Sequence, residues 1–228
     1  MKYVYITMVQ LPTLANKCMK VFTNFDYSHT SISFDEKLAT LYSFQGKNRK
    51  VLLVGGFVKE THDTYFHRKN VSLKEMVFKV PVSDDDYNKI FNFIKQLADD
   101  EEYIFNYVSA LFMLTFGGVK SYKAYHCVEF VSEVLSMTQD IKIPKRPHKM
   151  KPKDLYKVLK PFKIRDGLIH ANDFHFKEDS FTQRIKFDVA VKKSLYSVRE
   201  AICRATLHRT SKNFNYKNVN FYNEDTVA

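Results

Sequence analysis

Polar and apolar residues alternate in the segment SHTSISF, residues 28–34. Successive side chains of a strand point to opposite faces, so the alternation predicts a strand with one polar and one apolar face. The polar face carries His29, Ser31 and Ser33, and the apolar face carries Thr30, Ile32 and Phe34. We therefore expect the apolar face to contact the core and His29 to face a polar groove or solvent.

Other segments show the same two periodicities. Strands are expected where short apolar runs are rich in β-branched residues, at 3–10, 38–44 and 72–83. Helices are expected where apolar residues recur at helical spacing, at 11–24, 83–100, 103–116 and 152–159. The helix at 83–100 is the clearest, because Ser83 or Asp84 can cap it and acidic residues fill its first turn.

Cys127 lies where another helical pattern begins. Apolar residues follow it at helical spacing, namely Val128, Val131, Val134 and Leu135. The free N–H groups and positive dipole at a helix N-terminus favour a thiolate, which is the reactive form of cysteine. Cys127 is therefore a candidate nucleophile, and the alternative is a small buried residue of the core.

A basic amphipathic helix is expected near the C-terminus, at residues 189–207. Its apolar residues Val191, Leu195, Val198 and Ile202 step by four, three and four, and the other face carries lysine and arginine. The simpler interpretation is that the apolar face packs on the rest of the protein. The alternative is a helix that binds a membrane surface or a partner.

The net charge of +11 favours partners that carry negative charge. Residues 142–165 contain ten lysines and arginines opposed only by Asp154. This segment is either a solvated surface or a docking surface for anionic lipid or a membrane. Nucleic acid is an unlikely partner, because no aromatic ladder or nucleic-acid motif accompanies the charge. The oligomeric state is not predicted.

The three cysteines, Cys18, Cys127 and Cys203, are widely separated, which argues against a disulfide framework and a structural zinc site. We expect no cofactor and no metal. The pair His62 and His67 lacks a standard ligand spacing. No signal-peptide or transmembrane pattern is present, so a cytoplasmic location is expected.

A nucleophilic cysteine needs a base, usually histidine, and the chain has eight candidates. His126 is adjacent to Cys127, but neighbouring helical residues project in different directions, so we discount it. His29 is favoured because a strand holds it rigidly. The alternative is a buried cysteine and an unrelated surface histidine.

Three segments together, YSHTSISFDEKLATLYSF, GGFVKE and YHCVEFVSEVL, resemble the circularly permuted papain-like cysteine hydrolases. These form the YiiX/YebB-like branch of the NlpC-type superfamily, and the likeness runs to about residue 160. It implies an α+β, permuted papain-like fold in which an antiparallel sheet packs against helices and Cys127 opens the central helix. The hydrolase domain would cover residues 1–165, followed by a C-terminal extension at 166–228.

The resemblance also implies roles for individual residues. Cys127 would be the nucleophile and His29 the general base, with the Cys127 backbone N–H in the oxyanion hole. The third polar group maps to Ser43 or Tyr42, between which the sequence does not choose. Glu60 matches the acid that follows GGF and is either a structural ion-pair partner or a catalytic group.

The expected activity is hydrolysis of an amide or acyl-ester substrate through an acyl-enzyme. Two alternatives stay open, an acyltransferase of the same fold and a catalytically inactive module that binds through its basic surface.

Overall fold

The computed structural model describes residues 1–11, 24–48, 51, 53–66, 71–113, 117–174 and 185–216. Its strands are β1 (Lys2–Val9), β2 (His29–Ser33), β3 (Leu41–Gly46), β4 (Gly55–Glu60), β5 (Ser72–Val82), β6 (Ile104–Phe105), β7 (Ala124–Tyr125) and β8 (Lys163–His170). They form one eight-stranded sheet in the order β7-β6-β4-β3-β2-β1-β5-β8. Only the β6–β7 pair is parallel, so the expected α+β class with an antiparallel sheet is confirmed at that level.

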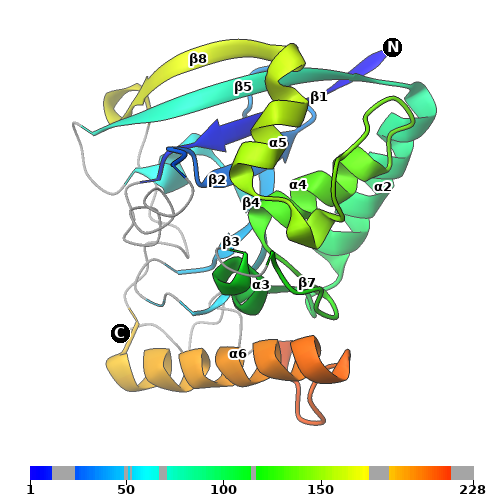
Figure 1. The fold of residues 1–228 in the computed structure, drawn as a ribbon. Helices are drawn as coiled ribbons and strands as arrows, with labels where there is room; N and C mark the ends of the chain where they lie inside the picture. The colour runs from blue at the N-terminus through cyan, green and yellow to red at the C-terminus, as the bar shows by residue number, and fades with distance from the viewer. Residues whose placement is uncertain are drawn as a thin grey trace.

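The described helices differ in where they lie. They are α2 (Asp84–Asp99), α3 (Tyr107–Phe112), α4 (Cys127–Ser136), α5 (Pro152–Leu159) and α6 (Phe187–Leu207), with short 3-10 turns η1 (His62–Tyr65), η2 (Pro147–Lys149), η3 (Lys160–Phe162) and η4 (Ala171–Asp173). Helices α2, α4 and α5 stand beside the sheet, whereas α6 crosses the end of the molecule below α3 and β7 (Figure 1). Within the described ranges, no helix is long and apolar enough to cross a membrane.

Several local predictions are confirmed by these bounds. The strand at 28–34 is β2, and the long strand at 72–83 is β5. Helix α2 begins after Ser83, whose hydroxyl accepts the N–H of Asp86 at 3.0 Å, as expected for an N-cap. The helix expected at 11–24 lies almost wholly outside the described residues, and so does Cys18.

The prediction of a single helix over residues 103–116 is wrong. Its first residues form strand β6, and the shorter helix α3 starts only after Asn106. The Asn106 side-chain oxygen accepts the N–H of Ser109 at 2.9 Å. An asparagine that satisfies a free helical N–H in this way starts a new helix, so the apolar run divides at Asn106.

Both faces of the central strands are covered. On one face Ile6, Ile32 and Phe44 join a large apolar cluster that includes Phe130 and Val131 of α4. On the other face Tyr5, Val9 and Leu41 join a second cluster, which includes residues of η1 and η4. All five residues of β2 are consequently buried. The expectation that His29 faces a groove or solvent is wrong, because η1 covers that face.

Helix α6 contacts the protein through its charged face, which corrects the expected orientation. Lys193, Glu200 and Arg204 are buried, whereas the apolar stripe of the same helix is exposed. Strand β8 pairs with β5 from Ser72↔His170 to Phe78↔Lys163. The sheet therefore continues past the expected domain boundary at 165/166.

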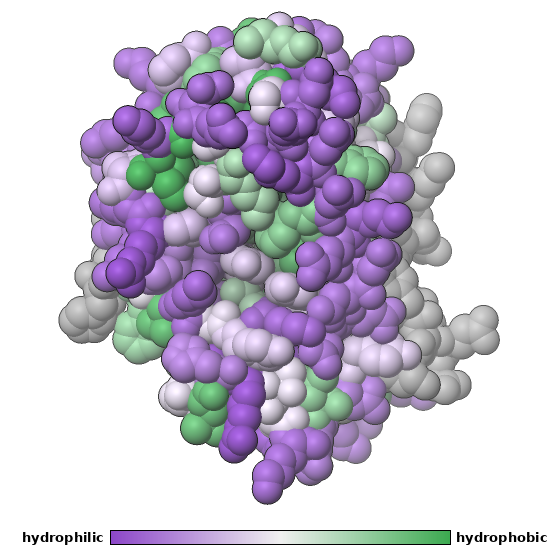
Figure 2. Space-filling model, turned by 90° about the vertical axis from the view of Figure 1, so that its right-hand side faces the viewer, coloured by the Kyte–Doolittle hydropathy of each residue, from purple (hydrophilic) through white to green (hydrophobic). Residues whose placement is uncertain are grey.

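Hydrophilic residues cover most of the side of the molecule drawn in Figure 2, and the hydrophobic patches there are separated from one another. The basic segment 142–165 contributes exposed lysines, of which Lys145 pairs with Asp154 at 2.6 Å and Lys163 with Asp166 at 2.8 Å. Its role as an anionic-lipid surface stays a prediction.

Candidate active site

The first turn of α4 places Cys127 at the helix N-terminus, as predicted. His126 is the N-cap residue, and its Nδ1 accepts the N–H of Glu129 at 3.3 Å. Behind this turn Val128, Phe130 and Val131 are buried against the sheet. Packing of these apolar side chains fixes the helix end, and with it the position of the thiol.

The Cys127 thiol lies against the start of β2. Its Sγ is 3.7 Å from the carbonyl oxygen of Ser28, the residue before His29. Among the described residues β2 and β3 pair only at Ile32↔Tyr42, so no ladder joins these two strands alongside His29. Cys127 is buried, with 8% of the residue exposed.

Glu60, at the end of β4, contacts the other side of the His29 ring. The Nε2 of His29 and the Oε1 of Glu60 are 2.9 Å apart, and both side chains are buried. This contact uses Nε2 and leaves Nδ1 as the second ring nitrogen of His29. Cys127, His29 and Glu60 are therefore residue types that can serve as a nucleophile, a base and a group that orients the base.

Tyr65 of η1 extends this polar chain. Its hydroxyl donates to Glu60 Oε1 at 2.9 Å and lies 3.1 Å from the hydroxyl of Ser31. Ser31 in turn lies 2.7 Å from the hydroxyl of Thr7 on β1. Because Tyr65 donates to Glu60, Ser31 donates to Tyr65 and Thr7 donates to Ser31. The buried polar side of β2 is thus hydrogen-bonded from β1 to Glu60.

The electrostatics favour an ion pair between the thiol and the imidazole. Burial by itself raises the pKa of Cys127, but hydrogen bonding to His126 and His29 outweighs it and lowers the pKa to about 6. Burial likewise lowers the pKa of His29, but the charge of Glu60 and the contact with Cys127 raise it to about 10. Between these values the thiolate and the imidazolium form coexist.

Backbone donors for a developing oxyanion are present beside the sulfur. The N–H of Glu129 is bonded to His126 Nδ1, and the N–H of Phe130 is bonded to the His126 carbonyl. The N–H groups of Cys127 and Val128 precede these and have no intrahelical acceptor. They can donate to an oxygen held next to Sγ.

His126, which we discounted from the sequence as a base for Cys127, is one of the side chains that lower the pKa of the thiol. It is buried, and its Nε2 lies 3.8 Å from Glu129 Oε2. Glu129 also lies 3.4 Å from the side-chain nitrogen of Asn106, and burial raises the pKa of Glu129 to about 7. The signal that could have identified His126 is its position, since an imidazole before the first helical residue can accept a first-turn N–H.

The two residues expected as the third polar group are not the ones that contact His29. Tyr42 lies opposite Ile32, so its side chain shares the α4 face, where it stacks with Phe57 at 6.2 Å. Ser43 is buried, and its Oγ has no hydrogen-bond partner among the described residues. Glu60 contacts His29 instead, although β3 lies between β2 and β4, because it is at the end of its strand opposite Leu41.

A second buried histidine forms a separate pair. His62 Nε2 is 2.6 Å from Glu75 Oε1, and Arg165 also contacts Glu75. His67, the other residue of the weak metal hypothesis, lies outside the described residues. Over the described ranges, no group of three or more His, Cys, Asp or Glu side chains could hold a metal ion.

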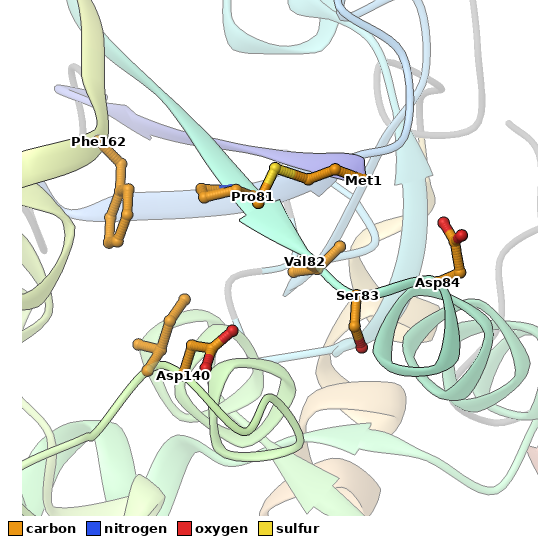
Figure 3. Close-up of a pocket in the computed structure, with 8 residues that line it drawn as sticks. Met1, Pro81, Val82, Ser83, Asp84, Asp140 and Phe162 are labelled. Atoms are coloured by element: carbon orange, nitrogen blue, oxygen red, sulfur yellow. The ribbon is translucent and has the colours of Figure 1, made fainter.

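Two cavities open on the surface of the described residues. One, of about 570 Å³, is beside β7 and the outer side of α4 and is lined by Tyr125, Glu129 and Glu133 among others. Figure 3 shows the other, of about 270 Å³, with Phe162 and Asp140 on opposite sides and Ser83 at the start of α2. Neither lining includes Cys127 or His29.

Comparison with known proteins provides no further information on this site. No protein-family model, curated protein or solved structure matches this chain.

Proposed function

We propose that this protein is a cysteine hydrolase that cleaves an amide or an acyl ester. The observation that carries the proposal is the buried chain from Cys127 through His29 to Glu60, built from three elements far apart in sequence. Buried ionisable groups that shift one another's pKa in opposite directions are typical of catalytic sites. The permuted papain-like resemblance of the sequence agrees with this assignment of nucleophile and base.

The reaction follows from the positions of these groups. The Cys127 thiolate attacks the substrate carbonyl carbon, and the N–H groups of Cys127 and Val128 stabilise the oxyanion. The His29 imidazolium then protonates the leaving amine or alkoxide as the acyl–sulfur bond remains. Neutral His29 next takes a proton from water, the hydroxide attacks the thioester, and the acid and the thiolate are released.

Glu60 acts as a positioning residue. Its carboxylate accepts the Nε2 proton of His29, which directs Nδ1 to the sulfur and stabilises the imidazolium. The hydroxyl of Tyr65 holds that carboxylate in place. Both are buried, so neither residue needs to contact the substrate.

Selective alkylation tests the nucleophile. Iodoacetamide should modify Cys127 below neutral pH, with half-maximal rate near the pKa of about 6. Cys203, which is partly exposed, is the internal control for labelling of an accessible thiol. Equal, slow labelling of both cysteines with ordinary thiol pH dependence would contradict the proposal and favour an inactive binding module.

Covalent trapping tests the reaction. Panels of acyl amides and acyl esters are incubated with the protein, and an acyl adduct on Cys127 is sought by mass spectrometry. The adduct should be absent in Cys127→Ala and should decay in water. Decay that requires an added amine or alcohol would identify an acyltransferase instead.

A further inference from the structure

Helix α6 has its polar and apolar faces in the reverse of the usual orientation. Its inward face carries Lys193, Ser197, Glu200, Ala201 and Arg204, all buried. Its outward face carries an apolar stripe, which we define as Phe187, Val191, Leu195, Val198 and Ile202. An amphipathic helix normally buries its apolar stripe, so the exposed stripe calls for a partner.

Specific contacts hold the polar face inward. The Arg204 side chain is fully buried and donates to the carbonyl oxygens of Glu102 at 2.6 Å and Lys123 at 2.9 Å. Glu200 lies 3.5 Å from its Nε, and the guanidinium covers the ring of Phe214 at 4.6 Å. Turning the stripe inward would break these contacts and strand a buried charge, so the orientation is determined by the protein.

The stripe is strongly exposed along the whole helix. Phe187 is 84% exposed, Leu195 67% and Ile202 53%. Successive residues of the stripe lie three or four positions apart on one side of α6, so they form a continuous line rather than scattered positions. Figure 1 shows that this helix forms one end of the molecule, with its outer side facing away from the sheet.

Charge identifies the partner. Lys192 and Arg199 are exposed along one border of the stripe, with Asp188 as the acid of that border. In a second copy docked antiparallel on the same stripe, the basic borders would face each other and repel. An apolar line bordered by cations matches an anionic lipid surface, into which the apolar side chains insert while the cations contact headgroups.

We infer that α6 docks the protein on anionic phospholipid membranes through this apolar stripe. The surface is distinct from the part of the basic segment 142–165 that forms α5 and β8, because these elements lie toward the opposite end of the molecule from α6 (Figure 1). The inference does not depend on catalysis at Cys127.

Vesicle binding tests the inference with the full chain. The protein is sedimented with phosphatidylcholine vesicles and with vesicles that also contain about 30 mol % phosphatidylserine. We expect binding to the anionic vesicles only. Leu195→Glu/Ile202→Glu should weaken it at least about tenfold, because two charges enter the inserted stripe.

Two matched controls isolate the stripe. Asn92→Glu/Gln96→Glu adds the same charge at exposed positions of α2 and should lower binding much less. Lys192→Gln/Arg199→Gln should weaken binding about fivefold for each cation removed, whereas Lys153→Gln/Lys157→Gln on α5 should have little effect. Circular dichroism melts establish that each variant is folded.

Three outcomes would overturn the inference. The first is no binding to anionic vesicles, or binding that Leu195→Glu/Ile202→Glu leaves unchanged. The second is binding that only Lys153→Gln/Lys157→Gln abolishes, which would assign it to segment 142–165. The third is lipid-free self-association that the stripe variant abolishes, which would identify a second copy of the chain as the partner.

Discussion

His29 and His62 are both buried imidazoles that contact a buried glutamate, and both rings lie near the ring of Tyr65. Their Nε2 atoms are 2.9 Å from Glu60 and 2.6 Å from Glu75, and their rings lie 5.5 Å and 5.8 Å from the Tyr65 ring. The neighbours of each pair differ. Arg165 also contacts Glu75, whereas a hydroxyl contacts Glu60.

This difference separates a structural pair from a candidate catalytic one. Glu75 has a permanent positive partner, and the His62 ring stacks on Phe174 at 5.2 Å. These contacts join η1, β5 and β8 and provide no nucleophile. His29 instead has a thiol among its neighbours, because Cys127 Sγ lies 3.7 Å from the carbonyl oxygen of Ser28 and raises the pKa of His29. A buried His–Glu pair therefore indicates chemistry only when a reactive group adjoins it.

The largest expected difference is between His29→Ala and His62→Ala. Without the imidazolium, the pKa of Cys127 rises from about 6 toward that of an ordinary thiol. Its alkylation rate at about pH 6.5 should then fall about 100-fold, as the thiolate fraction falls. His62→Ala should change that rate less than about threefold. Equal losses in the two variants would show that the pairs do not differ in this way.

Glu60→Gln and Glu75→Gln sharpen the comparison. The charge of Glu60 raises the pKa of His29, so its removal lowers that pKa and raises the pKa of Cys127. We expect the midpoint of Cys127 alkylation to move up by about one pH unit. Glu75→Gln should leave this midpoint unchanged. It should lower the free energy of unfolding by about 2 kcal/mol, which is less than for a fully buried ion pair because Arg165 is exposed. Stopped-flow alkylation and urea unfolding provide the two readouts.

Tyr65→Phe should have a smaller effect on the His29 pair. It removes the hydroxyl that donates to Glu60 and leaves a buried carboxylate oxygen with one partner fewer. The expected cost is about 1 kcal/mol of stability, with a rise of less than about half a unit in the alkylation midpoint. Tyr5→Phe is the control, because its hydroxyl contacts Glu36 instead. A shift as large as that of Glu60→Gln would assign Tyr65 a direct role.

The smallest expected change in stability alone concerns the cap of α4, which His126 provides while it also lowers the pKa of Cys127. Asparagine can accept the N–H of Glu129, so His126→Asn should retain most of the capping, whereas His126→Ala should cost about 1 kcal/mol. Thermal unfolding compares the two. Because the His126 side chain also lowers the pKa of Cys127, alkylation of Cys127 at about pH 6.5 should slow in both variants.

The His29–Cys127 pair could be predicted from the sequence, but its supporting residues could not. Strand alternation singled out His29, and helical spacing placed Cys127 in a first turn. Glu60 was visible as the acid after GGF, yet its contact depended on where β4 ends in the sheet. No local sequence pattern identified Tyr65. Its role depends on the packing of η1 over β2, which the sequence around Tyr65 does not determine.

Helix α6 marks the limit of periodicity most clearly. Its spacing correctly predicted a helix, and the same spacing suggested the wrong buried face. The sequence by itself determined the local periods, the helix starts and the residue types able to do chemistry, because neighbouring residues set these. Only the tertiary structure decided that Arg204 turns inward and that Glu60 contacts His29. The carbonyl oxygens that Arg204 binds, and the imidazole that Glu60 binds, belong to segments distant in the sequence.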